Sequence, residues 1–112
     1  MLPKNRCPAH PGVILFKHFL QPMDISQAEF VRHLDHNWTP TKLNEIIHGK
    51  RGVSLEVALD FADALGTSPE FWINLQTNHD LWKTLQQRHA KIQPIHFTPR
   101  EDQEDTRISA VS

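Results

Sequence analysis

The densest set of hydrogen-bonding side chains surrounds a narrow apolar stripe in the first half of the chain. Leu43, Ile46 and Ile47 recur at the spacing of one buried helix face. A helix that buries this face must expose Thr41, Lys42, Asn44, Glu45 and His48. Lysine can donate to guanine O6 and N7, asparagine can pair with adenine, threonine can contact a thymine methyl, and glutamate can accept from cytosine. The exposed side chains are therefore of the kinds that can read DNA base edges, and Lys50 and Arg51 just beyond the helix are of the kind that can neutralise phosphates.

Other chemistries have weaker support. Cys7 with His10, and His33 with His36, each have the spacing of half a metal site, but the ligand sets are incomplete. Cys7 is the single cysteine and lies in an N-terminal segment where we expect fraying and no preorganised partner for nucleophilic attack. We therefore predict no metal, no cofactor and no enzymatic activity. The competing interpretation of the polar run is an ordinary solvated helix face.

Length and charge bound the class of protein. One domain and a tail fit in 112 residues, and 38% apolar with 22% charged residues support a small packed core. The formal net charge of −1 gives no bulk positive field, so nucleic acid must be bound by a local patch. We find no apolar run of membrane-span length and no secretory signal pattern, and one cysteine fits a reducing compartment. We expect a cytoplasmic protein with no membrane partner.

Proline, glycine and hydroxyl side chains divide the chain into five expected helices. The first is an apolar run over 13–20, opened by Pro11. The others are expected over 26–35, 40–48, 54–65 and 68–88. Each of these four begins with a hydroxyl side chain that can cap its first turn: Ser26, Thr39, Ser54 and Ser68.

These helices predict an all-α domain over residues 10–90. Residues 1–9 form an expected N-terminal arm. Residues 91–112 lack apolar periodicity and carry a mixed, mostly acidic run, so we expect a mobile tail. Within this tail, the apolar residues over 92–97 offer a segment that could be pinned to the domain.

Two short helices with a tight connection, the second exposing a polar face, are typical of a helix-turn-helix. More specific motifs are His10-Pro-Gly12, Ser26-Gln-Ala-Glu-Phe30, Leu43-Asn-Glu-Ile-Ile-His-Gly-Lys-Arg-Gly52 and Ala64-Leu-Gly-Thr-Ser-Pro-Glu-Phe-Trp72. In these motifs the chain resembles the HigA-type antitoxins, also called VapI-type, of the lambda-repressor-like (XRE) helix-turn-helix superfamily. The resemblance runs from His10 to about Trp82.

The resemblance implies a five-helix DNA-binding protein of bacteria that forms a homodimer. It also implies partners: double-stranded operator DNA of its own operon, which it represses, and a small HigB-type ribonuclease toxin, which it neutralises. Gln27 falls where the superfamily contacts a phosphate, and Thr41, Lys42 and Glu45 fall on the groove-facing side. The full predicted DNA-binding set is Gln27, Thr39, Thr41, Lys42, Asn44, Glu45, His48, Lys50 and Arg51.

The connection between the two helices departs from the family pattern. Val31 and Asp35 stand where the superfamily usually has a small residue and a glycine. The stretch from Gln27 to Thr39 is also longer than the common pattern, so the turn must be extended. We expect Trp38 to fill the enlarged turn.

Two apolar surfaces exceed what a small core requires. The first helix carries a second stripe of Val13, Phe16 and Leu20, which predicts a partner interface unless the tail or the last helix covers it. The last helix is long and carries apolar residues that predict the dimer contact: Leu75, Leu81, Trp82 and Leu85.

Two functions of other kinds also fit the sequence. An interaction module could neutralise its partner without binding DNA, because the extended turn changes the angle of the reading helix. A free-standing transcriptional regulator would bind DNA and have no toxin. A band shift with promoter DNA distinguishes an operator-binding antitoxin from the interaction module, which would give no shift. A small ribonuclease gene in the neighbouring reading frame distinguishes an antitoxin from the free-standing regulator, which would have none.

Overall fold

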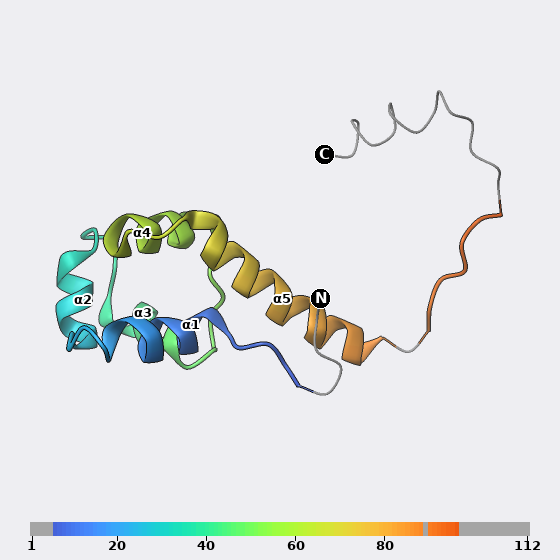
Figure 1. The fold of residues 1–112 in the computed structure, drawn as a ribbon, viewed down its shortest axis with the longest axis horizontal. Helices are drawn as coiled ribbons and strands as arrows, with labels where there is room; N and C mark the ends of the chain where they lie inside the picture. The colour runs from blue at the N-terminus through green and yellow to red at the C-terminus, as the bar shows by residue number, and fades with distance from the viewer. Residues whose placement is uncertain (1–5, 89, 97–112) are drawn as a thin grey trace, which may run out of the picture.

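Helices follow one another along nearly the whole of the chain that the structure describes. This computed structural model describes residues 6–88 and 90–96 (Figure 1). Its elements are α1 (Pro11–Ile14), η1 (Leu15–Leu20), α2 (Gln27–His33), α3 (Pro40–Ile47), α4 (Leu55–Leu65) and α5 (Pro69–Gln87). Since α1 continues directly into η1, the described residues hold five helices and no strand. The all-α prediction is confirmed.

The predicted capping residues begin their helices. The hydroxyl oxygens of Ser26, Thr39, Ser54 and Ser68 each accept a hydrogen bond from the backbone N–H three residues ahead. At α2 the cap is reciprocal, because Glu29 also accepts from the Ser26 backbone N–H at 2.9 Å. This hydrogen bond lowers the pKa of Glu29. The helix ends at His33, earlier than predicted, because Leu34 adopts an extended backbone with ψ of 175°.

The first helix widens into a π-helix at η1, and this corrects one predicted surface residue. Residues five apart lie on different faces of an α-helix, which has 3.6 residues per turn. In a π-helix, hydrogen bonds join residues five apart and bring them onto one face. Leu15 and Leu20 are accordingly both buried, at 0% and 1% exposure. Leu20 therefore belongs to the core, and the prediction that it faces a partner is wrong.

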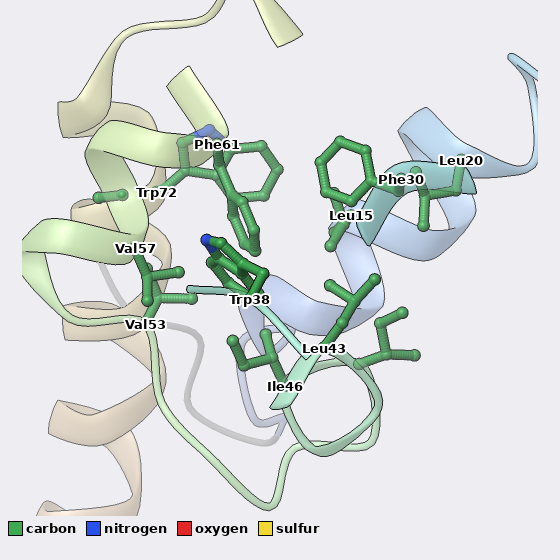
Figure 2. Packing of buried hydrophobic residues seen from close by; sticks show 12 residues of the cluster. Leu15, Leu20, Phe30, Trp38, Leu43, Ile46, Val53, Val57, Phe61 and Trp72 are labelled. Carbon is green, nitrogen blue, oxygen red and sulfur yellow. The ribbon is translucent and has the colours of Figure 1, made fainter. Parts of the chain in front are cut away.

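Three aromatic rings of the core lie close to Phe61 of α4, and Figure 2 shows the cluster to which they belong. Trp38 stacks on the Phe61 ring at 5.5 Å between centroids, and Phe30 and Trp72 approach it at 5.9 and 5.2 Å. Leu43, Ile46 and Ile47 of α3 are buried in the same cluster. The buried face of α3 therefore packs into the same core as residues of α2, α4 and α5.

A glycine allows α1 to lie directly on α3. A Cβ atom at Gly12 would fall 1.8 Å from the Ile46 carbonyl oxygen, which no side chain can tolerate. The preceding His10 caps the helix, because its Nδ1 accepts from the Gly12 N–H at 2.9 Å. The His10-Pro-Gly12 motif thus serves the contact that supports α3.

The segment before α1 packs against α5, where the sequence predicted a frayed end. His79 Nδ1 donates to the Pro8 carbonyl at 2.9 Å and lies 3.4 Å from Cys7 Sγ. The rings of His10 and His79 meet edge to face at 5.0 Å. Burial lowers the pKa of His10, and the facing His79 lowers it further, against the opposite effect of Asp80. The packing arises because α5 extends beyond the other helices and offers a surface to this segment (Figure 1).

The segment after α5 is extended and contacts little of the domain. Ile92 and Ile95 are 82% and 84% exposed, so the expectation that this segment is pinned is wrong over the part described. The remainder of the predicted tail, residues 97–112, lies outside the described residues, as do residues 1–5 of the predicted arm. Within the described ranges, no helix is long and apolar enough to cross a membrane.

Candidate nucleic-acid interface

The exposed face of α3 carries most of the predicted reading residues. Thr41, Asn44 and His48 are exposed, while Lys42 and Glu45 are half-buried. The opposite face is buried as the sequence predicted, because Leu43, Ile46 and Ile47 belong to the core. The side chain of Thr39 is occupied by its capping hydrogen bond from the Lys42 N–H at 3.1 Å. Thr39 therefore defines where the reading helix begins.

Gln27 at the start of α2 lies against this face. The Asn44 side-chain amide donates to Gln27 Oε1 at an N···O distance of 3.4 Å. His48 Nδ1 donates to the Asn44 carbonyl at 2.9 Å, one turn further along. The structure thus brings Gln27, Asn44 and His48 into one hydrogen-bonded row on the solvent side of α2 and α3.

Glu45 and Arg51 are paired with one another, which the sequence reasoning did not foresee. Arg51 Nε and Nη2 donate to Glu45 Oε1 at 3.0 and 2.8 Å. The backbone N–H groups of Lys50 and Arg51 both donate to the Glu45 carbonyl, at 2.8 and 3.2 Å. The basic turn therefore folds back onto the end of α3. Its cations lie beside the reading face, and the Lys50 side chain is exposed.

A glutamine of α5 holds the far side of this turn. The Val53 N–H donates to Gln76 Oε1 at 2.7 Å, and Gln76 Nε2 donates to Asp80 Oδ1 at 3.0 Å. Sequence reasoning missed Gln76. The available signal was its position one turn after Trp72 on the buried side of α5, where an apolar residue would be expected.

The connection between α2 and α3 is closed by Trp38, as predicted. Its side chain is only 5% exposed and stacks under Phe61 (Figure 2). The indole Nε1 donates to Asp60 Oδ2 at 2.8 Å. Lys42 Nζ lies 4.3 Å from the centroid of the same indole. Asp60 is a second residue that sequence reasoning missed, because nothing near it along the chain indicates its partner.

The residues of the predicted partner interface and the predicted dimer contact are partly exposed to solvent. Val13 is exposed and Phe16 is half-buried against the core. On α5, Leu81 and Leu85 are exposed, at 46% and 50%. Leu75 and Trp82 are half-buried. In the part of the chain that the structure describes, no three His, Cys, Asp or Glu side chains gather as a metal site.

Comparisons with known proteins point to one group. The chain is 37% identical over 96 residues to Antitoxin HigA-1 of Vibrio cholerae, a match covering 81% of this chain and 87% of that protein. Its structure is similar to antitoxin GraA, with a TM-score of 0.69 and 40% identity over 74% of this chain and 87% of that one. GraA in complex with its operator matches with a TM-score of 0.67 at 39% identity, over 78% and 86% of the two chains.

The structure of Pseudomonas aeruginosa antitoxin HigA with the higBA promoter is also similar. Its TM-score is 0.66 at 35% identity, over 70% of this chain and 84% of that one. No family model matches the chain.

Proposed function

Because the chain belongs to the HigA family of helix-turn-helix antitoxins, we propose that it binds operator DNA through α3 and represses its own operon. The observation that carries this proposal is the polar face of α3, which the core holds from behind and leaves open in front. The similar antitoxins GraA and HigA have structures with an operator and a promoter. Such a repressor acts by binding in the bacterial cytoplasm and needs no catalytic chemistry.

Local cations supply the electrostatics of binding. The formal net charge is −1, so attraction to DNA must come from Lys42, Lys50 and Arg51 beside α3. Lys50 can contact a phosphate directly, because its side chain is exposed. Arg51 must first exchange its contact with Glu45 for one with DNA. That exchange frees Glu45 to accept a hydrogen bond from cytosine.

Two copies are needed for a specific site, and α5 is the proposed contact between them. Leu81 and Leu85 are exposed beside half-buried Trp82, and Leu75 lies further back on the same helix. This half of α5 extends away from the other helices (Figure 1). A two-fold axis there would place two copies of α3 on half-sites about 10 base pairs apart or a multiple of that.

The proposed toxin surface is the outer side of the first helix, now reduced to Val13 and Phe16. A Phe16→Glu substitution should weaken capture of a HigB-type ribonuclease toxin or self-association and leave the helical content unchanged. Leu20→Glu is the contrasting variant, because it places a charge in the core and should unfold the protein. Unfolding of Phe16→Glu to the same extent would show that Phe16 serves the core alone.

The test of DNA binding is a band shift with the DNA directly upstream of the coding sequence. Lys42→Glu should abolish the shift, because it places a carboxylate in the groove. Lys42→Ala should cost about 1–3 kcal/mol and relax the preference at one base step. Lys50→Ala should weaken binding to all sequences and lower the salt slope by about one. Lys17→Glu, an equal charge change at an exposed residue outside the predicted set, is the control.

Two outcomes would favour the other functions. A dimer that captures toxin and never shifts promoter DNA would be an interaction module. A protein that shifts DNA but has no toxin gene beside its own would be a free-standing regulator. If the shift survives every Lys42 substitution, α3 is not the reader.

A further inference from the structure

We propose that Trp38 is a positioning residue for DNA recognition, which holds the ammonium group of Lys42 on its indole face while Asp60 orients the indole. The inference rests on the proposed function of α3 as the reading helix. It gives Trp38 a role in DNA binding in addition to filling the enlarged turn between α2 and α3.

Three contacts converge on this one side chain. One face of the indole packs on Phe61, with 5.5 Å between centroids and 27° between planes. The indole N–H donates to Asp60 Oδ2 at 2.8 Å. Lys42 Nζ lies 4.3 Å from the indole centroid. The ring is therefore fixed by α4 and in turn fixes a cation on α3.

The chemistry of the three groups is matched. A lysine ammonium is attracted to the negative face of an aromatic ring, and tryptophan is the strongest partner for it. An N–H that donates to a carboxylate pushes electron density into the indole, so the Asp60 contact strengthens that attraction. Packing alone requires neither the charge of Asp60 nor a cation on the ring, because an apolar side chain would fill the same space.

The consequence for binding is a smaller ordering cost. A free lysine side chain has many rotamers, and ordering it against DNA opposes association. Lys42 is already held at the base of the reading face, because its ammonium rests on a buried ring. Trp38 thus acts on DNA through Lys42 and contacts no base itself.

A double-mutant cycle of Trp38→Phe and Lys42→Ala tests this inference. The phenylalanine ring retains the stack on Phe61 and loses the N–H and most of the cation–π attraction. In the presence of Lys42, Trp38→Phe should weaken binding to the upstream DNA about three- to tenfold. In the Lys42→Ala background the same substitution should change binding by less than about twofold. Equal weakening in both backgrounds would overturn the inference, because Trp38 would then act on the fold alone.

A second pair of variants isolates the charge and does not depend on the folding of Trp38→Phe. Asp60→Asn keeps an acceptor for the indole N–H and removes the charge. Asp63→Asn, on the same helix and lining the same surface hollow, removes an equal charge without the indole contact. Asp60→Asn should bind the DNA about two- to threefold more weakly than Asp63→Asn. Equal DNA affinities of the two variants would count against the proposal that Asp60 acts on Lys42 through the Trp38 indole.

The outcomes separate the two levels of the proposal. A wild-type protein that fails to bind the upstream DNA overturns the proposed function and this inference with it. A wild-type protein that binds, with additive effects of Trp38→Phe and Lys42→Ala, overturns only the positioning role. Thermal unfolding of each variant shows that the compared proteins are folded at the assay temperature.

Discussion

The two ends of α3 are fastened by different physics. At its start, Trp38 is buried on Phe61 and bonded to Asp60, both on α4. At its end, the basic turn is held by polar contacts, through Glu45 and through the Gln76 amide of α5. The first attachment depends mainly on apolar burial, which salt hardly affects. The second depends on hydrogen bonds and an exposed ion pair, which neighbouring charges and salt can change.

This difference indicates a division of labour. The start of α3 is fixed to the core and sets the angle of the helix. The end of α3 is fixed to α5, the helix proposed to form the dimer contact. The start of α3 is thus attached to α4 and the turn after its end is attached to α5.

Removing the apolar attachment should have the largest effect. Trp38→Ala deletes a buried ring and leaves a cavity beside Phe61, so the free energy of unfolding should fall by about 3–5 kcal/mol. Urea denaturation followed by circular dichroism measures this loss. A loss below about 1 kcal/mol would mean that the start of α3 is not anchored by burial.

Removing the polar attachment should cost less. Gln76→Ala leaves the Val53 N–H without its acceptor in a partly buried site, and should lower stability by about 1–3 kcal/mol. Gln86→Ala, at an exposed position of the same helix, is the control and should be nearly neutral. If the two variants are equally stable, α5 does not hold the basic turn.

Breaking the ion pair at the same end should have a small, salt-dependent effect. The side chains of Glu45 and Arg51 are 37% and 50% exposed. Glu45→Gln should therefore change the free energy of unfolding by less than about 1 kcal/mol at low salt, and the difference should vanish at high salt. A larger loss that persists in high salt would place this pair among the strong supports of α3.

The smallest expected effect is a loss of stability at mildly acidic pH through His10. The pKa of His10 lies below its ordinary value of 6.5 in the folded protein, so the unfolded chain takes up this proton more readily. The stability from neutral His10 is fully present above 6.5 and falls as the pH drops below it. His10→Asn keeps a capping acceptor for Gly12 and removes the titration. Between pH 7.5 and 5.5 the thermal midpoint should fall less steeply with decreasing pH for His10→Asn than for wild type. Equal pH dependence of the two proteins would show that His10 does not contribute to it.

Local patterns in the sequence predicted the helices and the two faces of α3. Ser26, Thr39, Ser54 and Ser68 cap helices because capping depends on residues three apart along the chain. The buried stripe of α3 follows from helical periodicity alone. The role of Trp38 as a plug followed from the length of the turn, because an enlarged turn needs a large side chain to fill it.

Contacts between distant residues could not be predicted in this way. Asp60 and Gln76 are ordinary polar residues until the fold brings them to Trp38 and Val53, which lie 22 and 23 residues away along the chain. The periodicity of an α-helix places Leu20 on the surface, but the chain forms a π-helix there and buries it. Glu45 and Arg51 look like independent contacts in the sequence, although the reversal of the chain after α3 pairs them.

The short length of α3 limits how much information one subunit can read. Eight residues rising about 1.5 Å each span about 12 Å, which is the height of about four base pairs at 3.4 Å per step. A half-site of four specified base pairs occurs by chance about once in 256 base pairs, whereas two such half-sites at a fixed spacing occur about once in 65,000 base pairs. A second subunit therefore lowers the chance frequency of the binding site more than a longer α3 with one extra base contact would.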